Sequence, residues 1–457
     1  LTVMTFLGAG MLSGISAQVS PLQVDTLKET KIPDQWDLQS CIDYAKEQNI
    51  TIRKNRITAV STQIDVKTAK AALFPSLSFS TGHQVVNRPY QETSSRVSGS
   101  EIISSNSKTS YNGNYGLNAS WTLYNGNKRL KTIQQEKLNN QMAELDVATS
   151  ENNIQESIAQ VYIQILYAAE SVKVNENTLQ VSIAQRDRGQ ELLNAGSIAK
   201  SDLAQLEAQV STDRYQLVTA QATLEDYKLQ LKQLLELDGE NEMNIYLPAL
   251  SDENVLAPLP TKRDVYISAL SLRPEIEASK LNVEASELGI NIAKSSYFPT
   301  ISLSAGIGTN HTSGSDFTFG EQVKNGWNNS IGLSVSMPIF NNRQTKSAVQ
   351  KAKLQYETSM LSLLDEQKAL YKTIESLWLD ANSAQQRYAA ANEKLKSTQI
   401  SYELISEQFN LGMKNTVELL TEKNNLLQAQ QEQLQAKYMA ILNTQLLKFY
   451  QGDQLAL

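Results

Sequence analysis

The side chains that most often perform chemistry are scarce in this chain. Its 457 residues include two histidines, His83 and His311, and one cysteine, Cys41. These three residues cannot build a four-coordinate His/Cys metal site, and a lone cysteine cannot form an internal disulfide. Cys41 falls in a helical pattern, where we expect a small buried apolar residue. We place His83 in a strand and His311 in a loop, neither with a convincing Ser, Asp or Cys partner, so we expect no catalytic, metal or cofactor site.

Carboxylates are plentiful but spread along the chain. Asp and Glu number 48 against 41 Lys and Arg, which gives a net charge of −7. Many carboxylates fall in helical patterns as solvated side chains, and no pair stands out as an acid and its base. The acidic balance and the lack of a Lys/Arg cluster argue against a nucleic-acid partner. We therefore expect neither an enzyme nor a nucleic-acid-binding protein.

The start of the chain is typical of a secretory signal. Residues 3–15 form a short apolar run that is followed by the small residues Ser16 and Ala17. This pattern predicts a signal peptide over residues 1–17, with Gln18 as the first mature residue. The first basic residue is Lys28, so we expect the charged n-region to be missing and the native N-terminus to lie upstream. No other apolar run approaches the length of a transmembrane helix, which predicts an exported protein without one.

The sequence contains an internal repeat. Matching segments, in the same order in both halves, are 69–80 with 293–304, 116–121 with 332–337, and 194–196 with 410–412. A repeating unit of roughly 200 residues is too long for a solenoid. We therefore predict two similar halves, 18–247 and 248–457, related by pseudo-symmetry.

Each half contains one very long helical pattern and a shorter one after it. Residues 129–194 and 343–410 are rich in good helix formers and predict helices roughly 100 Å long. Residues 201–237 and 416–450 predict helices about half that length. Apolar residues recur every seven positions, which predicts left-handed supercoils. The heptad residues are Ile158, Ile165, Val172 and Leu179; Leu203, Val210, Leu217, Leu224 and Leu231; Leu363, Leu370, Leu377, Ala384 and Ala391; and Leu420, Leu427, Leu434 and Ile441. Taken alone, these segments favour a soluble antiparallel coiled coil.

A glycine joins each long helix to the shorter one. The joints are Asn194-Ala195-Gly196-Ser197 and Asn410-Leu411-Gly412-Met413. A glycine there ends a helix in a left-handed cap. We expect Ser201-Asp202, and Thr416 with Glu418, to supply the caps and first-turn acids of the following helices. The pattern predicts two helical hairpins with tight tips.

Four segments alternate between apolar and small polar residues. They are 76–85, 111–123, 300–309 and 327–339, and the polar segments 86–110 and 309–326 are predicted to be exposed loops. A period of two over about ten residues fits a tilted strand that crosses a bilayer. The alternative is a soluble sheet that packs against helices on one face. The small polar residues of the second face and the lack of a compact core favour the membrane interpretation.

The number of strands predicts oligomerisation. Four strands cannot close a barrel, and an open strand edge does not occur in lipid. Two copies would give a small barrel filled by side chains, whereas three would give twelve strands and a lumen. The predicted fold class is therefore all-α with membrane β: long coiled-coil helices forming an α-barrel, and four transmembrane strands per protomer.

This arrangement, repeated twice as helix, two strands, long helix and short helix, resembles the TolC family of outer-membrane channels from about residue 36 to 452. The specific matches are Phe74-Pro75 and Phe298-Pro299, residues 121–126 and 337–340, Arg273-Pro274-Glu275, and the glycine tips. The resemblance implies a homotrimer in the bacterial outer membrane with a helical tube in the periplasm. It also implies a periplasmic adaptor and an inner-membrane transporter, proton-driven or ATP-driven, as partners. The function would be a passive duct for efflux; a type I secretion duct and a soluble periplasmic scaffold are the alternatives.

The resemblance also implies roles for residues at the hairpin tips. The residues that would meet the adaptor are Ala195, Gly196, Ser197, Leu411, Gly412 and Met413. The residues that would form the periplasmic gate are Asp202, Phe409, Lys414, Glu418, Thr421 and Glu422. In the family an acid on one hairpin bonds a basic and a hydroxylated aromatic residue on the other, positions that match Asp202, Lys414 and Phe409. Phe409 lacks the hydroxyl and Lys414 makes a point contact where Arg would be bidentate, so a looser lock is expected. The alternative role of Asp202 and Glu422 is that of acids near a helix N-terminus.

Overall fold

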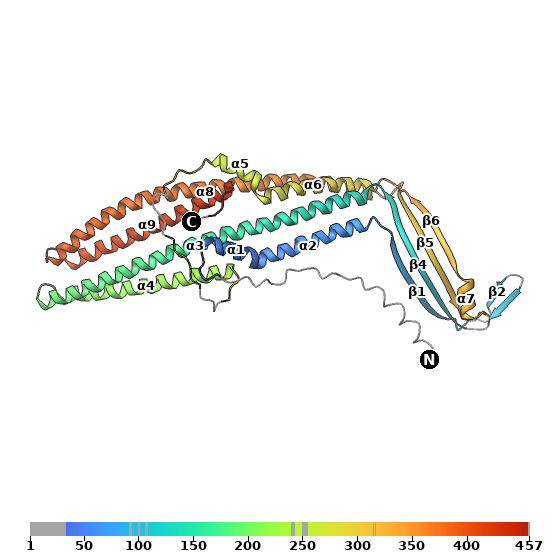
Figure 1. Cartoon of the computed structure of the whole chain (residues 1–457), viewed down its shortest axis with the longest axis horizontal. Coiled ribbons are helices and arrows are strands. Elements are labelled where there is room, and N and C mark those ends of the chain that lie inside the picture. The colour runs from blue at the N-terminus through green and yellow to red at the C-terminus, as the bar shows by residue number, and fades with distance from the viewer. Residues whose placement is uncertain are drawn as a thin grey trace. The chain divides into compact units, whose positions relative to one another are not determined.

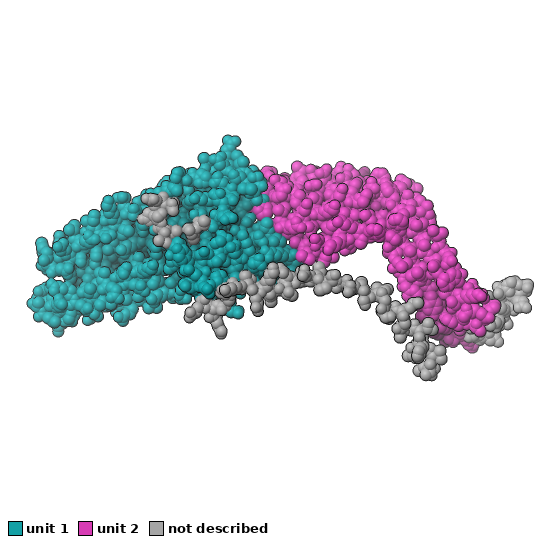
Figure 2. Space-filling view, viewed as in Figure 1, with its two compact units in different colours: residues 1–57, 147–273, 370–457 teal, residues 58–146, 274–369 magenta. Residues whose placement is uncertain are grey.

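The computed structural model describes residues 33–90, 94–98, 101–105, 108–238, 243–248, 255–313, 315 and 317–455. The predicted signal peptide, residues 1–17, lies outside this part of the chain. The chain divides into two compact units (Figure 2). Unit 1 comprises residues 1–57, 147–273 and 370–457, and unit 2 comprises residues 58–146 and 274–369. Both halves of the sequence thus contribute to each unit.

Unit 2 contains a four-stranded antiparallel sheet in the order β1-β4-β5-β6 (Figure 1). Its strands are β1 (Ser76–Asn87), β4 (Thr109–Asn125), β5 (Thr300–Thr312) and β6 (Asn328–Ser336). These are the four strands that the alternating pattern predicts. β6 stops before Pro338, because proline cannot donate a hydrogen bond to a strand ladder. The pairing of β4 with β5 joins the two halves of the sequence, while β1 and β6 each have one edge with no partner strand in the described chain.

One face of this sheet is apolar and open to its surroundings. Leu77 in β1 is 70% exposed and Ile331 in β6 is 79% exposed. Phe79, Val85, Leu333 and Val335 on the same strands are also exposed. Serine, glycine and asparagine predominate at the alternate positions on these strands, which also include Gln84 and Val86 of β1 and point to the other face. Contiguous apolar surface of this kind marks contact with a membrane or another protein.

The prediction of loops at 86–110 and 309–326 was partly wrong. β1 and β5 run past the predicted ends. The segment of sequence that connects β1 to β4 contains a second hairpin, formed by β2 (Ser94–Ser98) and β3 (Glu101–Ser105). The other segment contains a short helix, α7 (Phe319–Asn325). α7 begins with a capping box between Thr318 and Glu321. This local helix signal was overlooked because the segment is polar and was predicted to be a loop. Because β5 extends to Thr312, His311 lies in a strand and not in a loop.

The turns from strand to long helix have the same backbone conformation in both halves. Gly126 and Asn127 precede α3 (Lys128–Asn194) with φ of 68° and 64°. Asn342 and Arg343 precede α8 (Gln344–Asn410) with φ of 50° and 63°. Two successive left-handed residues are rare outside glycine, so the shared turn is a specific structural feature of the repeat. Unit 2 also includes most of α2 (Ile50–Ala71) and all of α6 (Pro274–Ser295).

Unit 1 is helical. It contains α1 (Leu38–Gln48), α4 (Lys200–Leu234), α5 (Lys262–Leu272), α9 (Thr416–Gln451) and the remaining parts of α3 and α8. The helices α3 and α4 form one antiparallel hairpin, and α8 and α9 form another (Figure 1). Residues of all four heptad stripes are buried, among them Ile158, Leu231, Ala384 and Leu434. No helix within the described ranges is both long enough and apolar enough to span a bilayer.

The core of unit 1 joins the N-terminal segment to the long helices. Trp36, Cys41 and Tyr162 are buried together there. The Tyr162 hydroxyl donates a hydrogen bond of 2.6 Å to the carbonyl of Tyr246. Burial raises the pKa of the Cys41 thiol to about 12, so this cysteine is an unreactive core residue, as expected. Arg273 lies over the Tyr450 ring at 3.5 Å and pairs with Glu156 at 2.8 Å.

Candidate functional site

Each helical hairpin ends in a tip built around one glycine. Gly196 and Gly412 have φ of 75° and 74°. Gly196 N–H donates to the Leu193 carbonyl and Ser197 N–H to that of Leu192, which is a Schellman cap. The second tip repeats these bonds, from Gly412 to Phe409 and from Met413 to Gln408. The predicted left-handed caps are therefore confirmed.

The two tips differ in the side chains they present. Ala195 and Ser197 are small and exposed. At the second tip Leu411 is 69% exposed and Met413 is 71% exposed. No described atom lies within 4 Å of the Cβ position of either tip glycine, so the surface above each glycine is open. The tips share a backbone but offer different chemistry to a partner.

The helices that follow the tips begin with capping interactions. The N-caps are Ala199 and Asn415, so the expected caps Ser201 and Thr416 were wrong by two residues and one residue. The Asp202 carboxylate accepts a hydrogen bond of 3.0 Å from Ala199 N–H. Asn415 and Glu418 form a reciprocal capping box. Asp202 and Glu418 thus both act on helix N-termini, the general role of acids at that position.

Lys414 and Glu418 form an ion pair within the second tip. Lys414 Nζ lies 2.5 Å from Glu418 Oε1, one turn away on the same hairpin. The hydrogen bond from Lys414 lowers the pKa of the Glu418 carboxyl below 4.5, helped by the backbone N–H of Asn415. Lys414 is therefore engaged within its own hairpin in this chain. The bond between Asp202 and Lys414 on different hairpins stays a prediction.

The remaining predicted gate residues lie on α8 and α9. Phe409 is buried, with 3% of its surface exposed. The Thr421 hydroxyl donates 2.7 Å to the Val417 carbonyl within α9. Glu422 accepts a hydrogen bond of 3.2 Å from Ser401 Oγ and so links α9 to α8. Glu422 also accepts a hydrogen bond of 3.4 Å from Asn425 Nδ2 within α9, so its observed contacts are not with the N-terminus of its helix.

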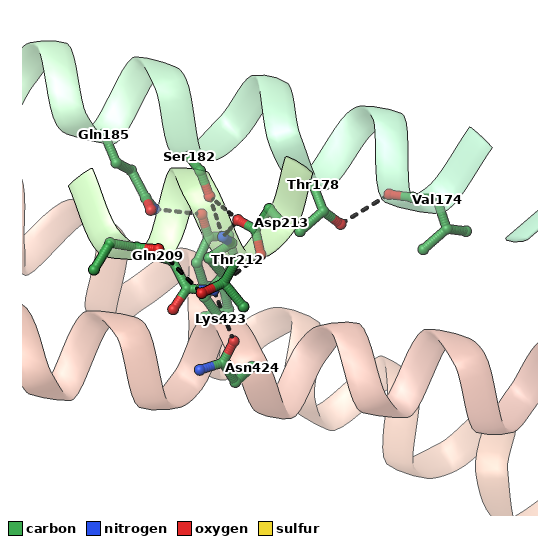
Figure 3. A network of polar contacts seen from close by, with 11 residues as sticks. Val174, Thr178, Ser182, Gln185, Gln209, Thr212, Asp213, Lys423 and Asn424 are labelled. Atoms are coloured by element: carbon green, nitrogen blue, oxygen red, sulfur yellow. Dashed lines mark hydrogen bonds and ion pairs between the residues drawn. The ribbon is translucent and has the colours of Figure 1, made fainter. Parts of the chain in front are cut away.

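A buried polar network lies between the two hairpins (Figure 3). Lys423 Nζ of α9 forms an ion pair with Asp213 of α4 and also contacts Ser182 Oγ of α3. The Ser182 hydroxyl donates to Asp213 Oδ2, and Gln209 Nε2 donates 2.9 Å to Asp213 Oδ1. Ser182, Asp213 and Lys423 are each at most 3% exposed. We call these four residues the inter-hairpin clasp.

The clasp ties three helices with a charge pair that water does not reach. Burial lowers the pKa of Lys423, while the hydrogen bond that Lys423 donates to the Asp213 carboxylate opposes that shift. Removing one partner of a buried ion pair destabilises the folded protein by about 3–5 kcal/mol, because the other charge stays buried without compensation. The clasp therefore makes the contact between the hairpins specific to one register. A second bridge, from Gln185 Nε2 to the Tyr402 hydroxyl at 2.8 Å, joins α3 to α8.

The clasp residues were not among the predicted site residues. Lys423 lies four residues after Leu419 and four before Leu427, both buried. Asp213 lies seven residues after Leu206, which is also buried. A charge at an apolar heptad position was the available signal, since such charges fix register between helices.

Solved structures share this fold. The chain matches CusC, for which transmembrane channel formation is described, with a TM-score of 0.77 and 19% identity over 91% of this chain and 92% of CusC. It is 24% identical over 294 residues to outer membrane efflux protein BepC of Brucella suis, covering 64% of this chain and 61% of BepC. It is also 24% identical over 294 residues to outer membrane protein TolC of Escherichia coli, covering 62% of this chain and 58% of TolC. These two alignments span about three fifths of each relative.

The match to CusC shows the fold of this chain, and a family model gives its class. The model of the outer membrane efflux protein family matches residues 41–236 and 265–452. This chain belongs to the outer membrane efflux protein family. One matched segment falls in each predicted half of the sequence, and the family is one of efflux proteins and not of enzymes.

Proposed function

We propose that the chain is one subunit of a trimeric outer-membrane channel, a passive duct from the periplasm to the exterior within a tripartite efflux system. The observation that carries this proposal is the sheet of unit 2. Its apolar face is exposed, and strands β1 and β6 have free edges in the described chain. A lipid-facing sheet must close on itself, because unpaired backbone groups are too costly in hydrocarbon. Pairing β6 of one copy with β1 of the next completes the wall.

Three copies are the number that fits a conducting lumen. Eight strands enclose an interior that side chains fill, whereas twelve leave room for passage. The small polar residues of the second face, such as Ser302 and Ser334, suit a water-filled interior. In this proposal the long helices continue the wall as a periplasmic tube.

The hairpin tips are the proposed docking and gating region. Ala195, Gly196, Ser197, Leu411, Gly412 and Met413 would contact a periplasmic adaptor, which links the duct to an inner-membrane transporter. Asp202, Phe409, Lys414, Glu418, Thr421 and Glu422 would surround the constriction. The open surface above both glycines supports docking, and the clasp supports a closed arrangement of the hairpins that must separate to open.

Two other functions use the same duct or the same helices. A type I protein secretion system would employ an equivalent outer-membrane channel with an ATP-driven exporter. A soluble periplasmic scaffold would need only the coiled coils. The exposed apolar face of the sheet weighs against the scaffold, since such a surface is unfavourable in water. Co-purification of a proton-driven or an ATP-driven transporter with the chain distinguishes efflux from secretion.

The test is the mass and conductance of the purified protein. Extraction should require detergent, and the mass of the particle should be that of three copies of the mature chain. In planar bilayers it should form discrete pores. A detergent-free monomer that forms no pores would contradict the proposal and favour the scaffold.

A further inference from the structure

Both histidines of the chain come together on the sheet of unit 2. His83 of β1 pairs with Gly113 of β4, and Gly113 pairs on its other side with His311 of β5. Residues paired directly across adjacent strands point to the same face. The His83 and His311 ring centroids are 6.3 Å apart. The sequence analysis had found no partner for either histidine, because it could not supply the register.

Glycine at position 113 is what allows this approach. A Cβ atom there would lie 2.1 Å from Cε1 and 2.6 Å from Nδ1 of His311. The His311 ring therefore lies over the Gly113 backbone, in the space that any other residue would fill. The two imidazoles therefore lie on the same face of the sheet with no side chain between them. We call His83, Gly113 and His311, with the tyrosines beside Gly113, the histidine platform.

Two tyrosines of β4 complete the platform. Tyr111 and Tyr115 flank Gly113, with centroids 5.8 and 5.4 Å from His83 and 5.3 and 5.9 Å from His311. The Tyr111 hydroxyl lies 2.8 Å from His83 Nδ1, and Thr81 Oγ1 lies 3.2 Å from Nε2. Phe319 of α7 packs edge-on against His311 at 5.0 Å. His311 Nδ1 is buried and has no hydrogen-bond partner among the described residues.

We propose that His83 and His311 form a two-imidazole site for a divalent transition-metal ion. Imidazole nitrogen is a preferred ligand of Zn²⁺, Cu²⁺ and Ni²⁺. A metal about 2 Å from one nitrogen of each ring places the ring centroids roughly 5–6.5 Å apart, a range that includes the observed separation. The site lies at the end of β5, one residue before Thr312, and His83 is exposed, so an ion reaches it where the sheet leaves the proposed hydrocarbon layer. The unpartnered His311 nitrogen gains a ligand bond it otherwise lacks.

Water and the Tyr111 hydroxyl would fill the remaining coordination positions. The described residues include no cluster of three or more His, Cys, Asp and Glu side chains suited to a metal. The site thus offers two strong protein ligands and binds reversibly. Because the ligands come from β1 and β5 on either side of β4, a bound ion would cross-link three strands of the sheet.

Copper titration of the full-length protein in detergent tests the site directly. The protein is expressed without a histidine tag, and His83 and His311 are the two histidines of the 457-residue sequence. Electron paramagnetic resonance of bound Cu²⁺ should show coupling to two imidazole nitrogens at one ion per chain, and Mg²⁺ should not compete. A spectrum without imidazole coupling, or with a single imidazole, would overturn the proposal. The readout needs no transport, so it is independent of the proposed channel function.

Three variants separate coordination from packing. His83→Gln and His311→Gln should each weaken Cu²⁺ binding by more than the roughly 10- to 100-fold that loss of an outer-shell partner costs. Gly113→Ala keeps both ligands but displaces the His311 ring, so it should also weaken binding. Gln84→Ala, beside His83 but on the opposite face, is the matched control and should bind as the parent does. Unchanged affinity in both histidine variants, with unchanged circular dichroism, would show that the rings only pack.

Discussion

At the scale of single residues, the buried ion pair between Asp213 and Lys423 in the inter-hairpin clasp has a large energetic consequence. Both side chains are removed from water: Asp213 accepts hydrogen bonds from Lys423, Ser182 and Gln209, and Lys423 donates to Asp213 and Ser182. Apolar residues of similar size would fill the same space at no desolvation cost. We infer that the charge pair is kept for specificity: only one alignment of α4 and α9 satisfies both groups.

Replacing either Asp213 or Lys423 alone should therefore lower the free energy of unfolding more than replacing both together. Lys423→Met or Asp213→Asn should each lower the free energy of unfolding by about 3–5 kcal/mol, and Asp213→Leu with Lys423→Met should restore most of it. Denaturant titration of the purified protein measures this. Lys394→Met is the matched control: it breaks an exposed pair with Glu432 and should cost less than about 1 kcal/mol. Equal losses at the two lysines would refute the buried-charge argument.

The tip ion pair should respond to acid. Because Lys414 and Asn415 lower the pKa of Glu418, the charged carboxylate stabilises the tip above its ordinary pKa of 4.5. That stabilisation is lost as the pH falls through the lowered value. A nitroxide label on Met413→Cys should become more mobile below about pH 4.5, while buried Cys41 stays unlabelled. The added change Glu418→Gln should remove this transition, and a transition that persists would assign it to another group.

At the scale of elements, the sheet differs from an ordinary half-buried sheet in the direction of its apolar face. The side chains of Ile331, Leu333 and Val335 along β6 are exposed, and no described element covers them. Alternate residues of the same strand are small and polar. A bilayer is the solvent in which this distribution is favourable.

A charge on one face of β6 should be far more costly than on the other. Leu333→Lys places an ammonium in the proposed hydrocarbon region and should destabilise the assembled channel by about 2–4 kcal/mol. Ser334→Lys, the adjacent residue on the opposite face, should have a small effect. The fraction of heat-resistant oligomer in gels compares the two. If both lysines were equally tolerated, neither face would be facing lipid.

The elements differ in how far the sequence could predict them. The long helices follow from heptad repeats and from the near-absence of glycine and proline, which are local properties. The β2–β3 hairpin and α7 were missed because polar composition does not distinguish a loop from a capped helix or an exposed hairpin. The pairing of His83 with His311 could not be predicted either. Alternation fixes the face of a residue, but the register depends on pairing between strands and on the irregularity near Thr122.

At the scale of the whole molecule, docking is proposed to depend on tips with little side-chain surface of their own. Leu411 and Met413 are the large apolar groups there, and both are exposed. Buried apolar contacts at the centre of an interface carry much of its binding energy. The second tip should therefore contribute more to adaptor binding than the first.

Acidic substitutions at the second tip should uncouple docking from channel formation. Leu411→Asp with Met413→Asp should abolish capture of a purified adaptor while pore formation and the oligomer remain intact. Ala195→Asp with Ser197→Asp, the equivalent change at the first tip, should weaken capture less. Pull-down and bilayer conductance, measured on the same preparations, separate the two properties. Loss of the oligomer in the first variant would indicate a structural role for the second tip.

The difference between the tips has a consequence for stoichiometry. In the proposed trimer the repeated backbone would place six tips in a ring, but only alternate ones would carry Leu411 and Met413. A partner that bound every tip would have to contact an apolar surface at three tips and a surface of small residues at the other three. A partner that recognised only the apolar tips would bind with three copies per channel. Counting adaptor copies per channel therefore reports whether the duplicated halves have kept one binding specificity or have diverged into two.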